Sequence, residues 1–249
     1  MTCGSKRATH YFKNRSTIVM GEVQNCAGRL FAIVGPTGAG KSTLMRQLQK
    51  ELQDKKCVFL SDSRCGEENN PLARYTRRVT QFIHEGVSEE TPPDVSMPIF
   101  WSRLASIIKA SIVPKIKNGV DVYIDGFGGT ILAHALYAAK SDRERDHLIK
   151  IHKSFIELYV IDAGLQPPTY FWLKPNPDIA YQRLKTINKA PRCEMTLEYI
   201  KKLNEGYEFY GNLPGQTVIP IDANQTDGEV LKRVLAHISS FACNHEIAV

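Results

Sequence analysis

A glycine-rich loop stands between an apolar run and an amphipathic segment near the start of the sequence. It reads Gly35-Pro-Thr-Gly-Ala-Gly-Lys-Ser42 and fits the pattern G-x-x-x-x-G-K-[ST]. The run before it, Leu30–Val34, is entirely apolar, which predicts a buried strand. In residues 42–55, apolar side chains recur at the spacing of one helical face. Strand, loop and helix in this order predict a phosphate-binding P-loop rather than a chance glycine-rich turn.

The residue types of this loop indicate a role for each position. Glycines let backbone N–H groups point inward at phosphate oxygens, and the following helix adds the positive end of its dipole. Lys41 is expected to reach the β- and γ-phosphates as a catalytic cation, and the Ser42 hydroxyl to bind Mg²⁺. ATP and Mg²⁺ are therefore the expected cofactors. The expected nucleotide-binding residues of the loop are Gly35, Pro36, Thr37, Gly38, Ala39, Gly40, Lys41, Ser42 and Thr43.

Strands and helices alternate along the rest of the chain. Further apolar strands are predicted at Cys57–Leu60, Val120–Ile124, Tyr170–Leu173 and Thr217–Ile221, where Pro220 favours an edge position. Helices are predicted at 71–85, 98–116 (with Pro114 kinking or ending it), 144–163, 177–185, 196–210 and 227–241, and a loop at 89–94. This alternation predicts an α/β fold, with a doubly wound, five-stranded parallel sheet flanked by helices. Its ligands are expected at the carboxyl ends of the strands.

Composition restricts the class of partner. The chain has 249 residues and a formal charge of +6, but its basic residues are spread out, so a polyphosphate is favoured over nucleic acid. No apolar run approaches the ~18 residues of a membrane-spanning helix. The six cysteines show no CxxC pair or zinc spacing, which indicates reduced thiols, and Cys57 is interpreted as a small buried residue.

The N-terminal residues 1–28 are basic and are predicted to be a mobile extension, with residues 29–249 as the P-loop domain. Lys6, Arg7, Lys13 and Arg15 precede Glu22, the first acid. A transit peptide has a similar composition and remains an alternative. Without one, the expected location is cytoplasmic.

Two carboxylates follow predicted strands. Asp125 ends the Val120–Ile124 strand and is expected to face the P-loop phosphates through Mg²⁺, although it could instead cap a turn beside Gly126. Asp62 and Arg64 follow the second strand, where they could contact the phosphoryl acceptor or be ordinary turn residues.

Aromatic and basic residues supply further candidates. Phe100, Trp101 and Arg103 could stack on and hydrogen-bond a nucleobase, but core packing of both rings and a solvated Arg103 is the favoured alternative from sequence alone. A basic segment could close over the transferring phosphoryl group, or simply form a solvated helix face. Its cations are Arg183, Lys185, Lys189 and Arg192.

The ordered series of motifs from Leu30 to Ile238 resembles the thymidylate kinases, within the wider thymidylate and deoxynucleoside kinase group. The motifs are Gly66 with Pro71-Leu-Ala73, Asp125-Gly-Phe-Gly-Gly-Thr-Ile-Leu-Ala-His134, Arg183-Leu-Lys-Thr-Ile-Asn-Lys-Ala-Pro-Arg-Cys-Glu194 and Ile221-Asp-Ala-Asn-Gln225. The resemblance implies transfer of a phosphoryl group from ATP to dTMP, a lid segment and a homodimer. It implies that Arg103 contacts the base, that Asp125, Phe127 and Thr130 contact substrate, that Arg192 is a catalytic lid residue and that Asn224 lies near the adenine.

Departures from the family pattern keep two other functions open. Gly126 stands where the family has the arginine that holds the acceptor phosphate, which favours a deoxynucleoside kinase with Asp62 as general base. Val34 and Thr37 replace family acids, and Ile187 replaces a lid arginine. These losses suggest a third possibility, a nucleotide-binding homologue with weak catalysis.

Overall fold

Five strands form one sheet in the computed structural model, which describes residues 27–61, 91–186 and 196–246. Neighbouring strands all pair in parallel, in the order β2-β3-β1-β4-β5. The predicted α/β fold and five-stranded parallel sheet are therefore confirmed, and Pro220 lies in the edge strand β5 as predicted. The strands are β1 (Leu30–Val34), β2 (Cys57–Ser61), β3 (Asp121–Asp125), β4 (Thr169–Lys174) and β5 (Thr217–Asp222).

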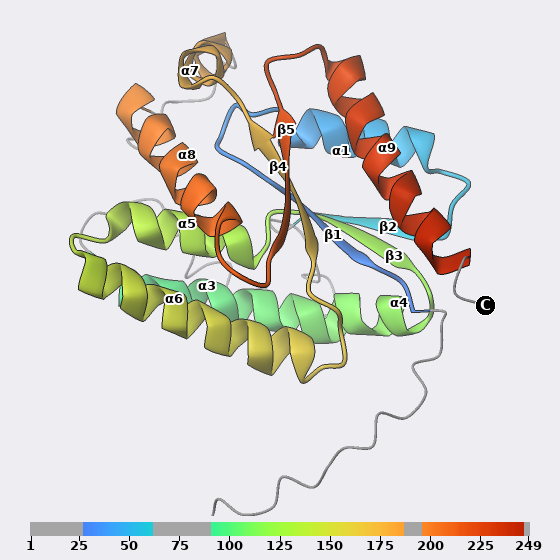
Figure 1. The fold of residues 1–249 in the computed structure, drawn as a ribbon, viewed down its shortest axis with the longest axis horizontal. Helices are drawn as coiled ribbons and strands as arrows, with labels where there is room; N and C mark the ends of the chain where they lie inside the picture. Colours follow the sequence, from blue (N-terminus) through green and yellow to red (C-terminus); the bar gives the residue numbers. More distant parts are fainter. Residues whose placement is uncertain (1–26, 62–90, 187–195, 247–249) are drawn as a thin grey trace, which may run out of the picture.

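Helices cover both faces of the sheet, as Figure 1 shows. α1 and α9 lie on one face, and α3, α5, α6 and α8 lie on the other. The helices of the described residues are α1 (Lys41–Glu51), α3 (Pro93–Ile107), α4 (Val113–Lys117), α5 (Gly128–Ala138), α6 (Asp142–Ile156), α7 (Pro177–Thr186), α8 (Leu197–Gly211) and α9 (Asp227–Glu246). Two π-helical segments, η2 (Ile108–Ile112) and η3 (Glu157–Ile161), continue α3 and α6.

Alternation along the strands builds a separate core on each face of the sheet. On the α1 and α9 face, four rings stack in a row across neighbouring strands: Phe59 on Tyr123, Tyr123 on Phe31 and Phe31 on Phe171, with ring centroids 4.9, 5.0 and 5.9 Å apart. The opposite face buries larger and more polar aromatic residues from strand and helix alike. Those with exposed fractions below 2% are Trp101, Phe127, Tyr170, Tyr207 and Tyr210.

The long helix predicted at 98–116 begins earlier than predicted and ends within one residue of the predicted end. It begins at Pro93, within the stretch predicted as a loop, and proline is favourable there because the first helical N–H has no partner. Pro114 does not end the helix, which continues to Lys117. In a regular helix its ring would clash with the carbonyl of the residue four positions earlier. The π-helical turn η2 falls at that place.

Helix α5 was not predicted from the sequence. It begins with Gly128 and Gly129, its N-cap Phe127 makes no side-chain capping bond, and it is apolar around most of its circumference. Propensity and periodicity therefore give little helical signal. Packing explains the glycine, because a Cβ at Gly128 would lie 2.6 Å from the Trp101 ring. Tertiary contacts rather than local preference form this helix.

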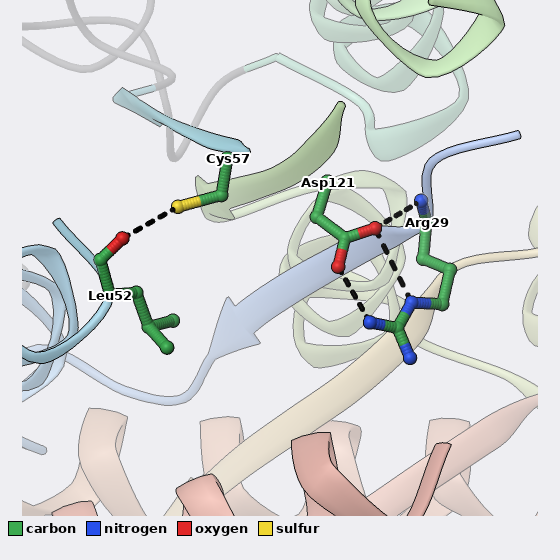
Figure 2. A network of polar contacts seen from close by, with 4 residues as sticks. All are labelled: Arg29, Leu52, Cys57 and Asp121. Carbon is green, nitrogen blue, oxygen red and sulfur yellow. Dashed lines mark hydrogen bonds and ion pairs between the residues drawn. The ribbon is translucent and has the colours of Figure 1, made fainter. Parts of the chain in front are cut away.

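Polar contacts close the amino end of the sheet, as Figure 2 shows. The guanidinium and backbone N–H of Arg29 both donate to the Asp121 carboxylate, with nitrogen–oxygen distances of 2.7 Å, so the starts of β1 and β3 are held together. Cys57 is half-buried rather than fully buried, and its thiol donates to the Leu52 carbonyl at 3.4 Å.

Some sequence predictions lie outside the described residues. These are the N-terminal extension up to residue 26, the helix at 71–85 and residues 187–195 of the lid. Gly28 is described and donates to the Ile116 carbonyl at 2.8 Å. Among the helices that the structure does describe, none is both long enough and apolar enough to pass through a membrane.

Candidate functional site

The glycine loop leaves β1 and enters α1 at the carboxyl end of the sheet. Gly35, Gly38 and Gly40 have φ angles of 144, 84 and 93°, in the range that favours glycine. Gly38 also packs against α7, where an added Cβ would lie 2.6 Å from the Ala180 carbonyl oxygen. The loop therefore has the backbone geometry that its glycines predict, and α7 supports it from outside.

The ammonium group of Lys41 bonds back to this loop. Its Nζ donates to the carbonyl oxygens of Gly35 at 2.8 Å and Pro36 at 3.0 Å. Loss of hydration lowers the pKa of Lys41, and the negative charge of Asp125 partly opposes that shift. A poorly hydrated cation in a glycine-rich loop at the start of a helix is a suitable group for binding phosphate.

Asp125 and Ser42 lie together next to Lys41. In the parallel register of β1 and β3, Asp125 is the partner of Ile33, so β3 ends beside the start of the loop. Burial raises the pKa of Asp125, while Lys41 and a hydrogen bond with Ser42 oppose the rise. A carboxylate and a hydroxyl fit Mg²⁺, which takes few protein oxygens and completes its octahedron with water and phosphate. Within the described part of the chain, no group of three or more His, Cys, Asp or Glu side chains gathers to hold a metal.

Trp101 and Phe127 lie inside the core. Their exposed fractions are 0 and 1%. Trp101 stacks on Phe155 with ring centroids 5.3 Å apart and meets the edge of Phe127 at 6.4 Å. Stacking on a base would require this core to repack. The expected base or substrate contact is therefore replaced by core packing for both residues, the alternative that the sequence favoured for Trp101.

Phe100 and Arg103 have different surroundings on the same helix. Phe100 is half-buried, and Arg103 is 9% exposed, so the alternative of a solvated Arg103 does not fit the structure. A guanidinium is rarely buried unless it has polar partners, because removing its hydration is costly. Contact of Arg103 with a base stays a prediction, and its burial shows only that the side chain does not extend into solvent.

Tyr207 of α8 joins the site although sequence reasoning missed it. Its hydroxyl lies 3.2 Å from the Gly35 carbonyl oxygen and 3.3 Å from Oγ1 of Thr130. Thr130, an expected substrate residue, is half-buried in the first turn of α5. Burial raises the pKa of Tyr207 to about 12. No local sequence signal identifies this tyrosine, because its partner Gly35 is 172 positions away.

Asn224, expected near the adenine, has a side chain already bonded within the protein. Its Oδ1 accepts from the Asn176 N–H at 2.6 Å, and its Nδ2 donates to Asp222 at 2.7 Å. Arg183 of α7 donates to the neighbouring Ala223 carbonyl at 3.1 Å. These bonds fix the loop after β5 beside a cavity of about 600 Å³ that Asn176 and Asn224 help to line. In this arrangement Asn224 shapes the loop.

Several expected site residues fall outside the described residues. They are Asp62, Arg64, Lys189 and Arg192. Of the cations at the start of the lid that are described, Arg183 bonds to the loop after β5, and the ammonium of Lys185 lies 4.5 Å from the centroid of the Tyr181 ring. The structure therefore brings together the P-loop, Asp125, Thr130 and Tyr207.

Several known thymidylate kinases are similar to this chain. That of Chlorobaculum parvum is 24% identical over 221 residues, covering 85% of this chain and 95% of the relative. That of Coprothermobacter proteolyticus is 27% identical, and the match covers 84% of this chain and 98% of the relative. That of Acinetobacter baumannii is 22% identical, and the match covers 82% of this chain and 97% of the relative. No protein-family model matches the chain. The similarity thus extends over the domain and is not limited to the glycine loop.

Proposed function

We propose that this chain is a nucleoside monophosphate kinase that transfers the γ-phosphoryl group of ATP to dTMP. The observation that carries the proposal is the grouping of the Lys41 ammonium, the Ser42 hydroxyl and the Asp125 carboxylate around the start of α1. Similarity to thymidylate kinases along 85% of the chain supports the reaction class and suggests the acceptor.

The donor nucleotide is bound by the loop from Gly35 to Thr43. The backbone N–H groups of the loop and the N-terminus of α1 meet the phosphate oxygens with partial positive charge. Lys41 exchanges the carbonyl oxygens of its own loop for oxygens of the β- and γ-phosphates. Ser42 and Asp125 hold Mg²⁺, which neutralises phosphate charge when bound.

The acceptor lies between α3 and the start of α5 in this proposal. Arg103, with Phe100 beside it, contacts the base, and Thr130 contacts the acceptor from the first turn of α5. From outside the described residues, Asp62 and Arg64 act near the acceptor, and Arg192 closes over the transferring phosphoryl group. Catalysis then depends on positioning and charge neutralisation in an in-line transfer, with little need for a strong base. Similarity alone supports the further proposals of a homodimer and a cytoplasmic location.

A deoxynucleoside kinase is the second candidate, and Gly126 favours it. Gly126 has a φ of 81° and no side chain at the position where the resemblance expects an arginine for the acceptor phosphate. An acceptor without a phosphate needs no such arginine, and thymidine would fit this chemistry. Asp62 would then act as general base for the 5′-hydroxyl.

An ADP-release assay with dTMP, dUMP, dGMP and thymidine distinguishes the candidates. The proposal expects turnover of dTMP above that of the other three acceptors. Faster turnover of thymidine would establish the deoxynucleoside kinase instead. ATP binding without turnover of any acceptor would contradict both and indicate a nucleotide-binding homologue with weak catalysis.

A further inference from the structure

Four polar groups from α5, α8 and the P-loop form a continuous chain of contacts. Thr130 of α5 contacts the Tyr207 hydroxyl of α8 at 3.3 Å, and that hydroxyl contacts the Gly35 carbonyl at 3.2 Å. The Lys41 ammonium reaches the same carbonyl oxygen at 2.8 Å. Gly35 and Tyr207 are buried, so little water is available to replace a lost partner.

The chemistry of each group fixes the direction of these bonds. The Gly35 carbonyl can only accept, so both Tyr207 and Lys41 donate to it. A phenol has one proton, so when Tyr207 donates that proton to Gly35, the contact with Thr130 is a hydrogen bond in which the Thr130 hydroxyl donates. Because burial raises the pKa of Tyr207 to about 12, the phenol keeps its proton throughout the physiological range.

Binding of a polyphosphate changes the partners of Lys41. Two of the three N–H groups of its ammonium donate to the carbonyl oxygens of Gly35 and Pro36. To bond both the β- and the γ-phosphate, the ammonium must leave at least one of these oxygens. If it leaves Gly35, Tyr207 is the remaining donor to that buried carbonyl among the described residues.

We propose that Tyr207 is a positioning residue for the donor nucleotide, because its hydroxyl keeps the Gly35 carbonyl hydrogen-bonded when Lys41 turns to the phosphates. The inference rests on the proposed function, since it requires that the loop bind a nucleoside triphosphate. Tyr207 touches neither phosphate nor metal in this proposal. It lowers the cost of the Lys41 movement and holds the first residue of the loop in place.

Two tyrosines of the same helix provide a matched test. Tyr207→Phe removes the donor to Gly35, whereas Tyr210→Phe removes a buried hydroxyl that bonds Gln216 at 2.8 Å, away from the loop. In Tyr207→Phe the Gly35 carbonyl has one donor before binding and none afterwards. We expect its affinity for Mg·ATP, measured by calorimetry, to fall roughly tenfold, within a range of about fivefold to a hundredfold. Tyr210→Phe should bind Mg·ATP within about twofold of the wild type.

A double-mutant cycle separates positioning from general destabilisation. With Lys41→Met, the Gly35 carbonyl keeps the same partners before and after binding, whether residue 207 is tyrosine or phenylalanine. The tenfold effect of Tyr207→Phe should therefore disappear in the Lys41→Met background. A merely structural role would lower affinity equally in both backgrounds.

The outcomes distinguish this inference from the proposed function. Wild-type protein that does not bind Mg·ATP would contradict the proposed function. Normal wild-type binding with unchanged affinity in Tyr207→Phe would overturn only the role of Tyr207, as would an equal loss in both backgrounds. Thermal melts of all variants, run beside the titrations, verify that each protein is folded when its affinity is measured.

Discussion

The two faces of the sheet have cores of different chemistry. On the α1 and α9 face, the core consists of the row of stacked rings from Phe59 to Phe171 together with aliphatic side chains. The opposite face buries polar atoms within its aromatic core. Within the described part of the chain, the indole nitrogens of Trp101 and Trp172 and both ring nitrogens of His152 have no hydrogen-bond partner.

This difference matches what each face supports in the proposed reaction. The apolar face holds α1 in place, and with it the loop that binds the phosphates in the proposed reaction. Close packing of apolar side chains is sufficient for this role. The other face supplies Thr130 and Tyr207 to the site, and its polar side chains are costly to bury. The donor side should therefore be sensitive to shape, and the acceptor side to protonation and hydrogen bonding.

The largest effect is expected from a methyl group added to the donor loop. In Gly38→Ala the new Cβ would meet the Ala180 carbonyl oxygen at 2.6 Å, at a φ of 84°. Strain and overlap together should cost about 3 kcal/mol of stability, which chemical denaturation measures. Gly164→Ala is the matched control, because Gly164 has a φ of 78° and a methyl group added there would meet no atom within 4 Å. Equal losses in the two variants would contradict the close packing of α7 on the loop.

An effect of about 2 kcal/mol should come from His152 on the acceptor side. Burial lowers the pKa of His152 to about 3, below its unfolded value of roughly 6.5. Between these values the unfolded chain binds a proton that the folded chain does not, so stability falls as the pH drops below about 6.5. From pH 6.5 to 5 this group alone should cost about 2 kcal/mol.

His152→Leu should remove this part of the pH dependence. Urea denaturation at pH 6.5 and 5 measures the difference for the wild type and the variant. His147→Leu, an exposed position on the same helix α6, is the control and should leave the wild-type slope in place. If the slope were the same in His152→Leu as in the wild type, the buried, neutral histidine would not be its source.

The smallest effect is expected at the rim of the apolar face. In the ion pair between Arg29 and Asp121, the side chains are 28% and 20% exposed, respectively. Asp121→Asn should weaken this pair and cost about 1 kcal/mol of stability. The pair between Lys174 and Glu208 is more exposed, with side-chain exposed fractions of 46% and 58%, respectively. Glu208→Gln breaks this pair and should change stability by less than about 0.5 kcal/mol. Thermal melts of the two variants compare the pairs directly, and a larger loss for Glu208→Gln would reverse the expected order.

Local sequence patterns predicted most of the fold. Short apolar runs identified every strand of the described sheet, and the spacing of Gly35, Lys41 and Ser42 located the loop between β1 and α1. Helix α5 was missed because its first turn is held by packing on Trp101 rather than by helix-forming residues. Prediction from sequence patterns succeeds where the conformational preference of the residues and the spacing of apolar positions indicate the same element.

The site was predicted less completely than the fold, because its contacts join distant segments. Tyr207 contacts Gly35, which is 172 positions away in the sequence. The Asn224 side chain is hydrogen-bonded to Asn176 and Asp222. Phe127 was assigned to substrate by motif, yet its ring is buried with Trp101. Whether a polar or aromatic side chain faces a ligand, the core or another loop depends on tertiary packing, which one sequence does not reveal.

The most direct test of a phosphate-binding Lys41 is calorimetric titration of Mg·ATP into three proteins. The wild type should bind, and Lys41→Met should bind roughly a hundredfold more weakly, because a charge-assisted contact with phosphate is lost. Lys50→Met, which removes an exposed cation at the other end of α1, should bind within about twofold of the wild type. Wild-type affinity in Lys41→Met would contradict the account.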